Sequence, residues 1–168
     1  IITTAIKKNI ADKKTIKDVH QLMETLNNHA TDAMETTKIN ACTDVTGYGL
    51  LGHLIELCDG SNLTAKINFK SIPFLNKTFD YAQKNIIPGG SKRNLEYYNH
   101  KIFFDKSFDT YKKLMLADAQ TSGGLLISVP KKYSLNLLKE LNNNSKYESY
   151  IIGHLIEKNK FSIIVSNE

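Results

Sequence analysis

Apolar residues recur at helical spacing in several parts of the chain. A helix is predicted from residue 11 to about residue 36, and the Asn27-Asn28 pair breaks or kinks it. The apolar residues that recur in it at near-helical spacing are Val19, Leu22, Met23 and Leu26. A broader apolar face predicts a helix over residues 47–57, and its members are Leu50, Leu51, Leu54, Ile55 and Cys58. Further helices are predicted over residues 74–84, 108–115 and 133–141.

Shorter apolar or alternating segments favour strands. They cover residues 39–43, 63–69, 100–104, 125–129, 150–156 and 161–165, and a weaker alternation also favours a strand over residues 1–8. A short turn at residues 158–160 joins the last two strands. Residues 87–99 have the composition of a loop, and residues 142–145 form a break. Because strands and helices are interspersed, the pattern predicts an α+β or α/β domain.

The composition is ordinary for a globular protein and fits one domain over residues 1–168, with 41% apolar and 23% charged residues. No apolar run reaches about 18 residues, and no secretion signal opens the chain. We therefore expect no membrane span and a cytoplasmic location. The chain opens abruptly and without Met, which favours a piece of a longer protein.

The net charge of +5 is compatible with anionic ligands such as nucleotides or phosphate. The basic residues are scattered as pairs, which favours a solvated surface over a nucleic-acid patch. Cys42 and Cys58 lack metal-site spacing, and we expect both to be buried free thiols in a reducing compartment. The five histidines are dispersed and form no recognisable ligand set.

The first candidate segment covers residues 41–53 and reads ACTDVTGYGLLGH. A strand ends, an acid follows at Asp44, and a glycine-rich turn opens a helix whose unpaired N–H groups suit phosphate. Gly47 and Gly49 would let a ligand approach the backbone closely. A carboxylate beside a phosphate commonly holds Mg²⁺. An equally open alternative is that Asp44 or Thr46 merely caps the helix.

The second candidate segment covers residues 116–126 and reads LADAQTSGGLL. The hydroxyls of Thr121 and Ser122, together with two glycines, could form a nest of donors for an anion. From the residues alone, a tight turn between helix and strand is the favoured interpretation.

The third candidate segment covers residues 87–94 and reads IPGGSKRN. It could be a mobile loop that brings Lys92 or Arg93 to a phosphate. A plain surface turn is the favoured alternative for this segment.

Taken in this order, the three segments resemble the selenide, water dikinase (selenophosphate synthetase) family. ACTDVTGYGLLGH is similar to that family's ACTDVTGFGLLGH, with Tyr48 in place of the usual Phe. PGGSKRN is similar to its PGG(T/S)xRN, and ADAQTSGGLL to its DPQTSGGLL, with Ala119 in place of the commoner Pro. The likeness continues to an IIGHL segment at residues 151–155 and covers nearly the whole chain.

The resemblance implies the C-terminal domain of the wider aminoimidazole ribonucleotide (AIR) synthetase-related superfamily. This domain is α+β, with a mixed or antiparallel sheet covered by helices and a partly ferredoxin-like topology. Members of the dikinase family convert selenide, ATP and water to selenophosphate, AMP and orthophosphate. The partner it implies is an N-terminal domain of the same protein, which binds most of the nucleotide, forms a homodimer and carries the nucleophilic Cys or selenocysteine and an essential Lys. Cys42 and Cys58 do not match that nucleophile, so the fragment alone is expected to be inactive.

The resemblance assigns one functional residue directly, because the Asp of the family's TDVTG motif is a magnesium ligand and matches Asp44. Mg²⁺, with ATP as substrate, is the implied cofactor. Thr43, Thr46 and Gly47 are expected to shape the loop or support the ligand. The expected interface or phosphate-binding residues are Asp118, Gln120, Thr121 and Ser122.

Two other functions stay open at this point. The chain could be a non-catalytic binding module of the same fold, or part of a sister enzyme that phosphorylates another acceptor. The residues encoded before Ile1 would separate these alternatives, because a glycine-rich segment with Cys or selenocysteine followed by Lys favours the dikinase.

Overall fold

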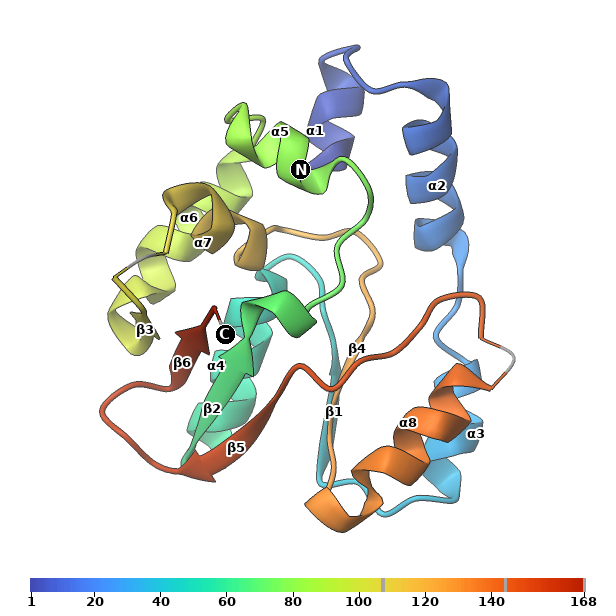
Figure 1. The fold of residues 1–168 in the computed structure, drawn as a ribbon, viewed down its shortest axis with the longest axis vertical. Helices are drawn as coiled ribbons and strands as arrows, with labels where there is room; N and C mark the ends of the chain where they lie inside the picture. Colours follow the sequence, from blue (N-terminus) through green and yellow to red (C-terminus); the bar gives the residue numbers. More distant parts are fainter. Residues whose placement is uncertain (107, 144, 168) are drawn as a thin grey trace.

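The computed structural model describes residues 1–106, 108–143 and 145–167, and the strands in these ranges form two sheets (Figure 1). The larger sheet has the order β3-β6-β2-β5, and its strands are β2 (Leu63–Asn68), β3 (Ile102–Phe104), β5 (Gly153–Glu157) and β6 (Ile163–Ser166). β6 runs parallel to both β2 and β3, whereas β5 is antiparallel to β2. The second sheet is an antiparallel ribbon of β1 (Ala41–Asp44) and β4 (Leu125–Ser128).

Helices cover the larger sheet and enclose the main core. α4 (Gly49–Gly60) packs on β2 and β6 through an apolar face that includes Leu51, Leu54 and Ile55. The remaining helices around this core are α1 (Ile2–Lys7), α2 (Lys13–Glu24), α5 (Thr78–Gln83), α6 (Gly89–Tyr98) and α7 (Thr110–Leu116), and two single 3₁₀ turns, η1 (Phe69–Ser71) and η2 (Asn99–Lys101), lie among the strands and helices. This mixed sheet with covering helices confirms the predicted α+β class.

A smaller lobe lies beside the β1–β4 ribbon (Figure 1). It consists of α3 (His29–Glu35) and α8 (Ser134–Asn142), with η3 (Lys131–Tyr133) leading into α8. Its own small core contains Ala30, Ala33, Leu137 and Leu141, and side chains of the ribbon pack against it. The ribbon therefore joins the two cores. β1 is the first part of the first candidate segment, which continues from the end of this strand into α4.

Three of the structural predictions are wrong. Residues 1–8 do not form a strand, because α1 occupies this segment and buries Ile2 and Ala5. Residues 87–99 do not form a loop, because α6 spans most of them. Cys42 is exposed, whereas Cys58 is buried as expected.

The other predicted elements are confirmed with shifted ends. The helix predicted over residues 11–36 is broken into α2 and α3 around Asn27 and Asn28. The last two strands exist but do not pair with each other, because β2 lies between them. α8 ends at Asn142, where the break over residues 142–145 is predicted to begin. Residue 144 of this break lies outside the described residues.

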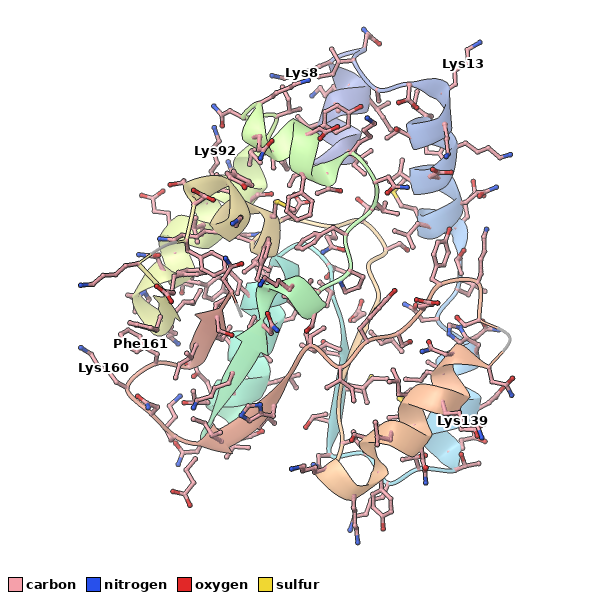
Figure 2. All side chains as sticks on the ribbon, viewed as in Figure 1. Lys8, Lys13, Lys92, Lys139, Lys160 and Phe161 are labelled. Atoms are coloured by element: carbon pink, nitrogen blue, oxygen red, sulfur yellow. The ribbon has the colours of Figure 1, made fainter. Side chains whose placement is uncertain are left out.

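The basic residues are spread over the molecule. Lys8, Lys13, Lys92, Lys139 and Lys160 lie at separate places around its outline (Figure 2). This distribution agrees with the solvated surface expected from the sequence. In the described ranges, no helix combines the length and the apolar character needed to cross a membrane.

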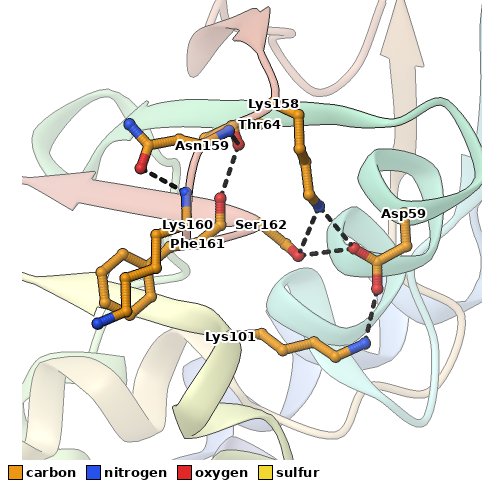
Figure 3. A network of polar contacts seen from close by, with 8 residues as sticks. All are labelled: Asp59, Thr64, Lys101, Lys158, Asn159, Lys160, Phe161 and Ser162. Carbon is orange, nitrogen blue, oxygen red and sulfur yellow. Dashed lines mark hydrogen bonds and ion pairs between the residues drawn. The ribbon is translucent and has the colours of Figure 1, made fainter.

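A polar network fixes the connection between β5 and β6 (Figure 3). The Asp59 carboxylate, at the end of α4, accepts hydrogen bonds from Lys101 Nζ at 2.6 Å, Ser162 Oγ at 2.6 Å and Lys158 Nζ at 3.1 Å. The buried Thr64 hydroxyl donates to the Phe161 carbonyl at 2.6 Å and accepts the Asn159 N–H at 2.8 Å. The network ties α4, β2 and the chain after β5 to one another.

The Asp59 network makes the stability depend on pH. Burial alone would raise the pKa of Asp59, but hydrogen bonds from Lys101, Ser162 and Lys158 outweigh it and lower the pKa from 3.8 to about 2. A carboxyl whose folded pKa is depressed stabilises the fold above its unfolded pKa, and this stabilisation is lost as the pH falls towards the folded value. The relevant window therefore lies between about pH 4 and pH 2.

We expect Asp59→Asn to lower the free energy of unfolding by about 1 kcal/mol at pH 7, a value kept small because these side chains are partly exposed and screened. Urea unfolding of both proteins between pH 7 and pH 2.5 would measure the difference. The difference in unfolding free energy between the wild type and Asp59→Asn should stay constant down to about pH 4 and then become smaller. Asp80→Asn is the matched control, because in the described part of the chain the Asp80 carboxylate pairs with Lys77 alone and both side chains are exposed. A difference in unfolding free energy that does not change with pH would contradict the lowered pKa of Asp59 in the folded protein.

Candidate functional site

Asp44 is the last residue of β1, and its side chain is exposed. Its backbone is fixed, because Asp44 pairs with Leu125 of β4 and the following Val45 donates its N–H to the Gly124 carbonyl at 2.9 Å. Among the described residues, the Asp44 carboxylate has no hydrogen-bond or ion-pair partner. It is therefore available to bind a cation.

The turn after Asp44 leads into α4 without a side-chain cap. Tyr48 precedes the helix, and neither Asp44 nor Thr46 caps it, so the capping alternative does not apply. Gly49 has a φ of +68°, and a Cβ there would lie 2.7 Å from the carbonyl carbon of Ala117. Packing therefore requires glycine at this position. A Cβ at Gly47, in contrast, would meet no atom within 4 Å, so the space beside this residue is open.

The segment after α7 lies directly against this turn. The Gln120 N–H donates to the Thr46 carbonyl at 3.1 Å. Gly123 is buried, and a Cβ there would overlap the Val45 carbonyl oxygen. The side chains of Gln120, Thr121 and Ser122 are exposed. The fold thus places these predicted residues next to the turn that follows Asp44.

The third candidate segment holds the other two together from α6. The Asn94 side-chain amide donates to the Gly47 carbonyl at 2.8 Å and to the Ala117 carbonyl at 3.2 Å. Ser91 is fully buried, donates to the Asp118 carboxylate at 2.8 Å and accepts the Ala119 N–H at 3.0 Å. All three segments therefore meet at one place.

Asp118 and the basic residues of α6 differ in their availability for ligands. The Asp118 carboxylate contacts Ser91 and also lies 3.0 Å from the Ile1 backbone nitrogen, so internal partners occupy it. Lys92 and Arg93 are exposed on the first turns of α6. Asp118 thus links the start of α1, α6 and the second segment, whereas Lys92 and Arg93 are exposed.

The residues present fit Mg²⁺ only as a partial site. The described residues contain no cluster of three or more His, Cys, Asp or Glu side chains that could hold a metal ion. Mg²⁺ in nucleotide sites, however, keeps several waters and takes only one or two carboxylates plus substrate phosphates. Asp44 suits that role, with open space beside Gly47 for a further group.

Cys42 shares the exposed side of β1 with Asp44. Partial burial and then the nearby Asp44 carboxylate raise the pKa of the Cys42 thiol. A raised pKa keeps the thiol protonated near neutral pH, and the thiolate is the nucleophilic form. Cys42 is therefore poorly suited to act as a nucleophile, despite its exposure.

The structure adds three polar residues that the sequence interpretation did not select, namely His53, Ser91 and Asn94. Ser91 and Asn94 are three residues apart, which places them on one face of a helix. Reading residues 87–99 as a helix would have paired them. In the sequence, His53 is one of five dispersed histidines, but its Nε2 lies 3.1 Å from the Thr46 nitrogen.

Similar proteins are found for almost the whole chain. The profile of the family described as AIR synthase related protein, C-terminal domain, matches residues 2–166. A selenide, water dikinase from Aliarcobacter butzleri is 39% identical over 166 residues, which cover 99% of this chain and 48% of that protein. One from Clostridium botulinum (strain Eklund 17B / Type B) is 38% identical over 98% of this chain and 48% of its own length. One from Myxococcus xanthus is 41% identical over 84% of this chain and 41% of its own length.

The chain thus spans about half the length of the curated relatives that it matches. Among solved structures, a thiamine monophosphate kinase from Aquifex aeolicus is more distant, with 16% identity, a TM-score of 0.48, and coverage of 86% of this chain and 37% of that chain. The family profile and the dikinase relatives confirm the resemblance seen in the three segments. The chain belongs to the AIR synthase related family as a C-terminal domain, and it is homologous to selenide, water dikinases.

Proposed function

We propose that this chain is the C-terminal domain of a selenophosphate synthetase, which forms selenophosphate, AMP and orthophosphate from selenide, ATP and water. The observation that carries the proposal is the meeting of the three candidate segments around Asp44, which is exposed and whose carboxylate has no partner among the described residues. The dikinase relatives at 36–41% identity support the choice of selenide as acceptor.

In this proposal Asp44 is a ligand of the Mg²⁺ that accompanies ATP. Mg²⁺ bound with the nucleotide neutralises phosphate charge during transfer. Thr43 and Thr46 flank the ligand, and Gly47 leaves its side of the turn open to a phosphate. Gln120, Thr121 and Ser122 supply exposed polar groups beside the same turn, whereas Asp118 acts through its bond to Ser91.

The remaining parts of the active site belong to an N-terminal domain in this proposal. That domain supplies most of the nucleotide site, the nucleophile and the dimer contact, and the whole protein works in the cytoplasm. Among the described residues, the site offers one free carboxylate, that of Asp44, and one carboxylate does not hold a nucleotide. We therefore expect the isolated chain to bind ATP poorly and to be inactive.

The proposal is tested by adding selenide to the full-length protein with ATP and Mg²⁺. We expect selenide to stimulate formation of AMP and orthophosphate, together with a ³¹P resonance from a phosphorus–selenium product. Stimulation by a different acceptor would instead identify a sister enzyme, and no ATP consumption with any acceptor would favour a binding module. Turnover by the 168-residue chain alone would contradict the expected incompleteness.

A further inference from the structure

His53 lies beneath the turn that follows Asp44. It belongs to the first turns of α4 and is 8% exposed. Its Nε2 lies 3.1 Å from the Thr46 backbone nitrogen and 3.3 Å from the Thr46 hydroxyl. Thr46 is two residues from Asp44, so His53 reaches from the helix back to the loop that carries the carboxylate.

The partners of the ring determine which nitrogen carries the proton. A backbone N–H can only donate, so Nε2 must accept the Thr46 hydrogen bond with its lone pair. The proton of the neutral ring is then on Nδ1, which lies 3.5 Å from a Glu56 carboxylate oxygen. Glu56 therefore favours the tautomer that the Thr46 contact requires. This assignment follows from the hydrogen-bond network.

The same turn is held from outside α4 by three other bonds. Val45 N–H donates to Gly124, Gln120 N–H donates to the Thr46 carbonyl, and the Asn94 amide donates to the Gly47 carbonyl. His53 is the side chain of α4 that completes this set by accepting the Thr46 N–H. Without it, the donor side of the Thr46 peptide would lose its partner, and the turn could rotate relative to Asp44.

We propose that His53 is a positioning residue: its neutral Nδ1–H tautomer, supported by Glu56, accepts the Thr46 N–H and holds the turn so that Asp44 faces the Mg²⁺–nucleotide. This inference rests on the proposed function. It assigns His53 no contact with substrate. It predicts an effect on the Mg²⁺ dependence of the reaction beyond any effect on folding.

The variants that test the proposal are His53→Gln, His53→Leu and His53→Asn in the full-length protein. The Gln amide oxygen can reach the position of Nε2 and accept the Thr46 N–H. Leu fills a similar space without an acceptor, and Asn is polar but too short. We expect Leu and Asn to raise the half-saturating Mg²⁺ concentration about 10-fold, and Gln to stay close to the wild type.

A purely structural role would lower the folded fraction and kcat equally in all three variants without changing the Mg²⁺ dependence. Either an unchanged Mg²⁺ dependence in Leu and Asn, or failure of Gln to rescue it, would overturn the proposal. Asp44→Asn, assayed in parallel, separates the magnesium role of Asp44 from the positioning role of His53. If Asp44→Asn has no effect, the proposed magnesium role of Asp44 fails and the role of His53 fails with it, whereas an effect of Asp44→Asn alone removes only the role of His53. The proposed function itself fails only if selenide does not stimulate ATP consumption by the wild type.

The tautomer of the His53 ring can also be measured directly in the wild-type protein. The ¹⁵N shifts of the His53 ring in the 168-residue chain and in the full-length protein should show Nδ1 protonated and Nε2 unprotonated at neutral pH. A ring protonated on Nε2 cannot accept the Thr46 N–H and would overturn the assignment even if every variant failed to fold.

Discussion

Asp44→Asn is expected to reduce the Mg²⁺-dependent ATP consumption of the full-length protein at least about 100-fold. A metal that neutralises phosphate charge contributes several kcal/mol to transition-state stabilisation, and each factor of ten corresponds to about 1.4 kcal/mol. Asn keeps the size of the side chain but removes the charge that attracts a hard cation. Steady-state rates over a range of Mg²⁺ concentrations would measure the loss.

The fold should not be affected by this substitution. Asp44 is exposed and its side chain has no protein partner among the described residues, so the melting temperature of Asp44→Asn should match that of the wild type. Asp32→Asn is a matched control, because Asp32 is an exposed acid on α3, in the lobe away from the larger sheet. Wild-type turnover in Asp44→Asn would remove Asp44 from the site, and equal losses in both variants would indicate a general effect of charge.

Most elements of the fold could be predicted from the sequence, because periodicity reports which side chains are buried. α1 could not, since Ile2, Thr3 and Thr4 are β-branched and favour strands locally. Burial of Ile2 and Ala5 in the main core outweighs that preference. α6 was hidden by Pro88, Gly89 and Gly90, which are typical of loops but here form the entry and first turn of the helix.

The exposure of Cys42 could have been predicted from Asp44. Alternate residues of a strand face the same side, so Cys42 and Asp44 share one face of β1. An exposed Asp44 therefore implies an exposed Cys42. The burial pattern of β1, in which Cys42 and Asp44 are the exposed positions, shows this parity.

The site itself was only partly readable from the sequence. The placement of Asp44 at the end of a strand follows from local pattern. The bonds that join the three segments connect residues far apart in the chain, such as Asn94 to Gly47 and Gln120 to Thr46. No periodicity reports such contacts, and only the tertiary structure brings them together.

Gly123→Ala is the second substitution with a large expected effect. The added methyl group would overlap the Val45 carbonyl and lie 2.8 Å from the Gln120 side-chain oxygen. Overpacking against backbone costs about 1–3 kcal/mol, which corresponds to a fall of roughly 2–12 °C in melting temperature for a domain of this size. Val45 follows Asp44 directly, so the displaced backbone should also lower Mg²⁺-dependent activity in the full-length protein.

Gly124→Ala is the matched control for this effect, because the two glycines are neighbours in sequence and differ only in their surroundings. A Cβ at Gly124 would meet no atom within 4 Å, and Gly124 is not in the left-handed region. Its melting temperature should therefore stay near that of the wild type, with a change in stability below about 0.5 kcal/mol. If the isolated Gly124→Ala domain keeps its stability while the full-length variant loses activity, a ligand or second domain covers this position. Equal stability of both variants would contradict the close packing of Gly123 on Val45, and with it the contact that fixes the backbone behind Asp44.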